Sequence, residues 1–117
     1  MGLDVTITRE VTLSNDYQKG ESIIKRNIMY QTKGWELGEF LIQIFNCDNC
    51  VPVLISDPEG ALLEVDKEIE ELNYEPSIYE HDQEQRDVYI HDLKSILDLL
   101  TLAKRETRSE WRLELSW

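Results

Sequence analysis

The chain has 117 residues and a formal net charge of −12 at pH 7, because 24 Asp and Glu residues outnumber 12 Lys and Arg residues. The length predicts one domain, residues 1–117, with one hydrophobic core, and the negative charge disfavours binding to nucleic-acid phosphates. No apolar run approaches the roughly 20 residues of a membrane span and the N-terminus does not resemble a signal peptide, so we expect a cytoplasmic protein of a bacterial cell with no membrane partner.

Residues 3–13 predict a half-buried β-strand, because apolar and polar residues alternate along them. The apolar positions are Leu3, Val5, Ile7, Val11 and Leu13. Turn-forming residues follow at 14–20. A weaker strand over Ser22–Tyr30 would then return antiparallel to the first as a hairpin, with Ile24, Ile28 and Tyr30 on one face.

Residues Trp35–Phe45 predict a short helix with one apolar face. Gly34 and Gly38 each cost this helix roughly 1 kcal/mol relative to Ala, so it depends on packing more than on intrinsic propensity. The polar segment Asn46–Asn49 ends it.

A brief apolar strand is predicted at Val51–Ile55, and Pro52 favours a place at a sheet edge or at the start of the strand. Asp57-Pro58-Glu59 then begins a second helix, because Asp57 can accept backbone N–H bonds and proline suits the first helical position. Its buried stripe consists of Leu62, Val65, Ile69 and Leu72. A connecting loop is expected over residues 73–82.

The longest and most apolar segment, Asp87–Arg105, predicts the main core helix. Its apolar positions recur at steps of three and four: Tyr89, Leu93, Ile96, Leu97, Leu100 and Ala103. Asp82 and Gln85 form a capping-box pattern before it. A last alternating segment, Trp111–Trp117, predicts a final strand.

The predicted order is therefore β-β-α-β-α-α-β, an α+β fold in which helices cover one face of a small antiparallel or mixed sheet. We expect the strands from the two ends of the chain to lie near each other. An exposed sheet edge at these terminal strands would allow a homodimer.

Negative charge is concentrated between Asp57 and Asp87. This segment holds twelve carboxylates, opposed only by Lys67 and Arg86, so it carries −10 of the net charge of −12. Two interpretations remain open. The carboxylates keep a small protein soluble, or they form a surface that attracts basic proteins.

Two groups of residues have side chains suited to chemistry, and each also has an ordinary explanation. Cys47 and Cys50 form a C-x-x-C pair, but the pair follows a helix, where the dipole disfavours a thiolate, and a zinc site needs two further ligands. Two ordinary loop cysteines are the favoured interpretation. His81, Asp82, His91 and Asp92 would suit an acid–base or metal site, although no nucleophile or third partner is evident and solvated histidines are favoured.

Three tryptophans are candidate anchors for a partner protein, because aromatic residues concentrate at binding hot spots. Core packing is the expectation for Trp35 and Trp111, whereas Trp117 at the terminus could belong to either class.

Short motifs at both ends of the chain resemble a family of small bacteriophage-encoded proteins. The matching motifs are Met1-Gly2-Leu3-Asp4 before an alternating strand, Asp48-Asn49-Cys50 after the first helix, and the final Ser116-Trp117. The chain departs from that family at residues 30–41, which lack its His and Arg. The resemblance implies a phage or prophage protein that acts in a host cytoplasm, and it implies no particular reaction.

We therefore expect a non-enzymatic, acidic binding protein that needs no cofactor and docks on a basic host or competitor protein, as counter-defence inhibitors and immunity proteins do. The expected contacts are Glu64, Glu68, Glu71, Glu75 and Asp82. One alternative is a binder of a nucleotide signal, which would require a basic pocket around Lys25, Arg26 and Lys33. Another is a metal-dependent enzyme that uses His81, Asp82, His91 and Asp92.

Overall fold

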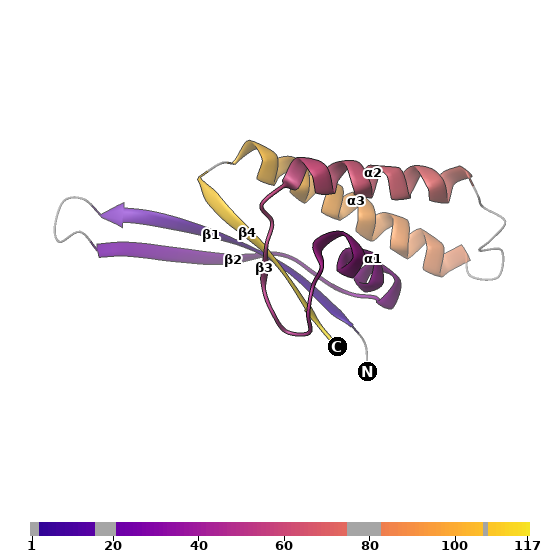
Figure 1. The fold of residues 1–117 in the computed structure, drawn as a ribbon, viewed down its shortest axis with the longest axis horizontal. Helices are drawn as coiled ribbons and strands as arrows, with labels where there is room; N and C mark the ends of the chain where they lie inside the picture. Colours follow the sequence, from indigo (N-terminus) through magenta and orange to yellow (C-terminus); the bar gives the residue numbers. More distant parts are fainter. Residues whose placement is uncertain (1–2, 16–20, 75–82, 107) are drawn as a thin grey trace.

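The structure is a computed structural model that describes residues 3–15, 21–74, 83–106 and 108–117. These residues form a four-stranded sheet and three helices in the predicted order, which confirms the α+β fold (Figure 1). The elements are β1 (Asp4–Asn15), β2 (Glu21–Lys33), α1 (Trp35–Phe45), β3 (Val53–Leu54), α2 (Pro58–Tyr74), α3 (Gln83–Arg105) and β4 (Ser109–Ser116).

The strand order is β2-β1-β4-β3, and each neighbouring pair is antiparallel. β1 and β4 lie side by side from Asp4↔Ser116 to Val11↔Ser109, which confirms that strands from the two ends of the chain are neighbours. The expectation that these terminal strands form an exposed edge is wrong. β2 covers one side of β1 and β3 covers part of the far side of β4, so the terminal strands are interior and β2 and β3 are the edges.

One face of the sheet carries the core. Six inward residues of the two central strands are almost inaccessible to solvent: Leu3, Val5, Ile7, Trp111, Leu113 and Leu115. All three helices lie on this face, as Figure 1 shows, and the residues that alternate with the inward ones stay partly exposed on the opposite, uncovered face. The period of two therefore buries one face of β4 and of the first half of β1, as expected. Farther along β1, Val11 is only partly buried, and the side chain of Leu13 lies outside the described residues.

A β-bulge interrupts this alternation in β2. Ile7 pairs with Tyr30 and Thr8 with Ile28, so Met29 has no paired residue on β1. The extra residue reverses which face the preceding residues point to. Tyr30 points to the helices, whereas Ile24 and Ile28 lie on the uncovered face, 57% and 64% exposed. The prediction that these three residues share a face is therefore wrong.

α3 is the central helix, as expected, and buries Leu93, Ile96 and Leu100 completely or almost so. α2 packs along α3 with its own stripe of buried residues. The start of α2 is held as predicted, because the Asp57 carboxylate accepts a hydrogen bond from the Gly60 backbone N–H at 3.0 Å. Within the described residues, no helix is both long and apolar enough to cross a membrane.

The end of α2 is held by a residue of α3. The guanidinium of Arg86 is buried and donates a hydrogen bond to the carbonyl oxygen of Leu72 at 2.7 Å. α2 has no basic residue in its own last turn, so Arg86 provides the positive charge that favours a helix C-terminus.

Candidate functional site

A line of three carboxylates, which we call the α2 stripe, consists of Glu64, Glu68 and Glu71. These residues are spaced i, i+4 and i+7, so they lie on one side of the helix, next to its buried residues. Glu64 and Glu71 are exposed and Glu68 is half-buried. The other two expected contacts, Glu75 and Asp82, lie outside the described residues.

No described residue neutralises the charge of the α2 stripe. None of its three carboxylates forms an ion pair with a described residue. Glu59, on another side of α2, does so: its carboxylate lies 3.4 Å from the Lys104 ammonium. Burial, and then the negative charge of Glu71, raise the pKa of Glu68. Both effects disfavour the charged form, so a cation placed beside Glu68 would relieve an existing electrostatic cost.

Glu64 also stands at the rim of a cleft between the end of α1 and the start of α2. The cleft has a volume of about 430 Å³. Apolar side chains from α1 and β3, namely Ile44, Phe45, Val53 and Leu54, line it together with the first turn of α2. The α2 stripe thus begins where apolar surface is accessible, an arrangement of charges around an apolar contact that is common at protein interfaces.

Carboxylates also occupy the other exposed side of α2. Asp66 and Glu70 are exposed there, and Lys67 is the only basic residue in the α2 sequence. The negative charge therefore surrounds the solvent-facing part of the helix rather than a single edge of it.

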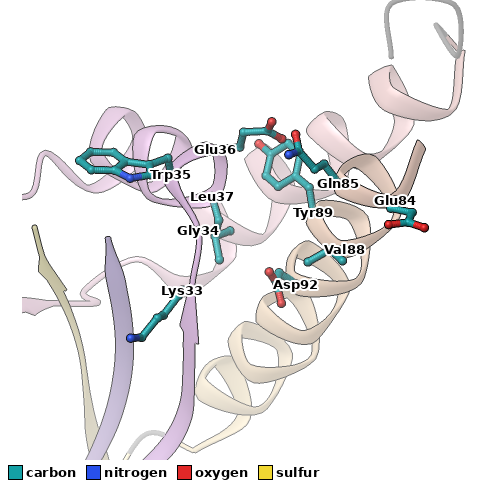
Figure 2. Close-up of a pocket in the computed structure, with 10 residues that line it drawn as sticks. All are labelled: Lys33, Gly34, Trp35, Glu36, Leu37, Glu84, Gln85, Val88, Tyr89 and Asp92. Carbon is teal, nitrogen blue, oxygen red and sulfur yellow. The ribbon is translucent and has the colours of Figure 1, made fainter. Parts of the chain in front are cut away.

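A second cavity, the α1–α3 pocket, lies where the end of β2 and the first turn of α1 face the first half of α3 (Figure 2). Its volume is about 450 Å³. The lining residues are Lys33, Gly34, Trp35, Glu36, Leu37, Glu84, Gln85, Val88, Tyr89 and Asp92. Sequence reasoning did not identify this pocket. The available signal was Asp92, a carboxylate that falls between Tyr89 and Ile96 in the apolar stripe of α3.

Asp92 is held in the pocket by Tyr30. Its side chain is only 6% exposed, and its Oδ1 atom accepts a hydrogen bond from the Tyr30 hydroxyl at 2.5 Å. Burial, followed by the neighbouring Asp92, raises the pKa of Tyr30 to about 12. The phenol is therefore a persistent donor that fixes the carboxylate at the boundary between β2 and α3.

Of the two tryptophans that were expected in the core, only one is buried there. Trp111 is buried in the core at 3% exposure, as expected. Trp35, which was expected in the core, is 50% exposed and lines the α1–α3 pocket. As the first residue of α1 it precedes the apolar face that begins at Leu37, so its side chain is not directed into the core.

The residues of the predicted metal or acid–base site are not brought together within the described chain. Asp92 is buried, whereas the neighbouring His91 is exposed; His81 and Asp82 lie outside the described residues. No three His, Cys, Asp or Glu side chains of the described part could hold one metal ion.

The predicted basic pocket is also not formed. Lys25 and Arg26 are consecutive residues of a strand and point to opposite faces. The Arg26 guanidinium lies 3.0 Å from the Glu10 carboxylate, and the Lys33 ammonium lies 3.8 Å from that of Asp4. Arg26 and Lys33 are separated along β2 and directed at carboxylates of β1, and Lys25 points to the other face, so the three cations do not converge on a phosphate.

Cys47 and Cys50 are free thiols in the turn after α1. Burial, and then the charge of Asp48, raise the pKa of the Cys47 thiol, which is the opposite of what a reactive thiolate needs. Cys50 is exposed and adopts a left-handed backbone conformation, with its Sγ 3.4 Å from the Ser116 hydroxyl.

Comparison of the chain with protein-family models, curated proteins and solved structures gave no match.

Proposed function

We propose that this protein is a non-enzymatic inhibitor that binds the basic surface of another protein through the α2 stripe. One observation carries the proposal: Glu64, Glu68 and Glu71 have no cationic partner among the described residues, and one of them is partly desolvated beside another carboxylate. Retaining the charge of Glu68 costs folding stability, and an arginine or lysine of a partner would offset that cost on binding.

The contribution of the stripe to binding has two parts. Long-range attraction from the −12 net charge raises the association rate and falls with added salt. Short-range ion pairs with the stripe select the partner, while the apolar side chains in the cleft beside Glu64 supply water-excluding contact. The proposed setting is a bacterial cytoplasm in which the protein acts for a phage or prophage, as the motifs at the chain ends imply.

The test compares two double variants that remove the same charge from the same helix. Glu64→Gln with Glu71→Gln alters the stripe, whereas Asp66→Asn with Glu70→Gln alters the other exposed side of α2. A partner is first captured from host lysate on the wild-type protein and identified, and its dissociation constant is then measured for wild type and both variants at low and high salt.

We expect the stripe variant to weaken binding by about tenfold or more, since each 1.4 kcal/mol of lost interaction is a factor of ten. The matched variant should change it by much less, through long-range charge alone. If the two variants weaken binding equally, the stripe contributes only its net charge and makes no specific contact. Binding that does not weaken with salt would refute the proposal.

A further inference from the structure

We propose that the α1–α3 pocket receives the side chain of one arginine of the partner protein. This inference rests on the proposed function and adds a second, more specific contact to it. The occupant follows from the shape of the pocket, its charge and the way its buried carboxylate is fixed.

The pocket offers apolar surface to the stem of a long side chain. Leu37 and Tyr89 are buried and form its inner wall, whereas Trp35 and Val88 are 50% and 57% exposed at its mouth. A volume of about 450 Å³ falls within the range of ligand-binding clefts. Two large apolar side chains left half-exposed beside a cavity are typical of surfaces that another molecule covers.

The charges around the pocket favour a cation. Three acidic residues line it, Glu36, Glu84 and Asp92, and the carboxylate of Glu84 points away from α1 in Figure 2. The only cation, Lys33, points away from α3 in Figure 2, toward the Asp4 carboxylate on the uncovered face of the sheet. The positive end of the α1 dipole opposes this preference, but Glu36 in the first helical turn counters it.

Arginine fits this combination better than lysine. A guanidinium is planar and donates in a fork that matches a carboxylate. The Tyr30 hydroxyl holds Oδ1 of Asp92 and thereby fixes the orientation of that carboxylate before any ligand arrives. A fixed, largely buried acceptor favours a rigid donor over a flexible ammonium.

The test uses N-acetyl-L-argininamide as the probe and N-acetyl-L-citrullinamide as its uncharged analogue, in which a urea replaces the guanidinium. Binding to the full-length protein is followed by two-dimensional ¹H–¹⁵N NMR, including the indole N–H signal of Trp35. Glu36→Gln removes one carboxylate of the pocket, and Glu39→Gln removes an exposed carboxylate of the same helix that does not line it.

We expect saturable shifts at residues 34–37 and 84–92 with the arginine probe, and binding of the citrulline probe to be about tenfold weaker or undetectable. Glu36→Gln should weaken arginine binding severalfold, while Glu39→Gln leaves it unchanged. Absence of saturable shifts, or equal binding of the citrulline probe, would overturn the inference. Equal binding of N-acetyl-L-lysinamide would overturn the assignment to arginine.

The same experiment separates this inference from the proposed function. The Glu64→Gln, Glu71→Gln protein should bind the arginine probe as wild type does, because neither residue lines the α1–α3 pocket. If the probe does not bind while partner binding still depends on the stripe, only the inference fails. If the probe binds while partner binding ignores the stripe, the proposed function fails and the guanidinium preference of the pocket stands.

Discussion

Replacing Gly38 by Ala tests how closely α1 packs on β1. In an exposed helix interior this change would stabilise the protein by about 1 kcal/mol, because Ala has the higher helix propensity. At position 38 a Cβ atom would lie 2.8 Å from Leu3 Cγ and still closer to both Leu3 methyl groups. Leu3 is completely buried in the core cluster, so its side chain could move only by displacing other core residues.

The two effects have opposite signs, and the clash is expected to prevail. Overpacking a core typically costs about 1–3 kcal/mol, and the upper part of that range applies because three atoms of Leu3 are too close. The net change is then a loss of about 1–2 kcal/mol in the free energy of unfolding. Urea denaturation followed by circular dichroism measures this value, with the m-value as a check on two-state behaviour.

Two further variants make the result specific. Gly34→Ala is the control, because a Cβ atom there would meet only Leu37 Cβ at 4.0 Å. Gly34 is the N-cap of α1, where Gly is preferred to Ala, so we expect a loss of about 0.5–1 kcal/mol from the weaker cap and none from packing. Leu3→Ala should cost about 2–5 kcal/mol alone but less in the Gly38→Ala background, since the new methyl group then fills part of the cavity. Stabilisation of the protein by Gly38→Ala would refute the close packing.

Three other changes should each affect stability in a defined way. Asp57→Ala removes the cap of α2 and should lower the free energy of unfolding by about 1 kcal/mol in urea titrations; no loss would mean that the cap is replaced by water. Arg86→Ala leaves the buried Leu72 carbonyl without its charged donor and should cost about 2 kcal/mol, with Arg86→Lys intermediate in the same assay. The pKa of Tyr30 is raised to about 12 from an ordinary value near 10, so the stabilisation of its neutral form is complete below pH 10 and is lost as pH rises toward 12. Tyr30→Phe should therefore reduce the fall in stability over this range, and an unchanged pH profile would contradict the shielding of the phenol and its bond to Asp92.

The strands and helices could be predicted because each is determined by the residue pattern of its own segment. The alternation in residues 3–13 and 111–117 is the period of a strand with one buried face, and the predicted helix Trp35–Phe45 has the bounds of α1. Asn46 ends that helix in a left-handed conformation, which asparagine adopts more readily than most residues. Nearby residues determine such features, so no knowledge of distant parts of the chain is needed.

The candidate site was predicted less completely. The α2 stripe follows from helical spacing, and its members lie on one side of α2 as the sequence implies. The α1–α3 pocket does not follow in this way, because residues from β2, α1 and α3 become neighbours only after the helices pack on the sheet. Trp35 shows the difference: its apolarity suggests burial, but its position before the apolar face of α1 leaves it at the mouth of a pocket.

The sequence by itself determined the order of strands and helices, which faces of the central strands are buried, and the concentration of carboxylates on α2, since all of these depend on periodicity and charge along a short segment. Only the tertiary structure decided that the terminal strands are central, that a bulge at Met29 places Ile24 and Ile28 on the face opposite Tyr30, and that Gly38 lies against Leu3. These features depend on contacts between residues far apart in the chain, where register and close packing are fixed by the whole fold.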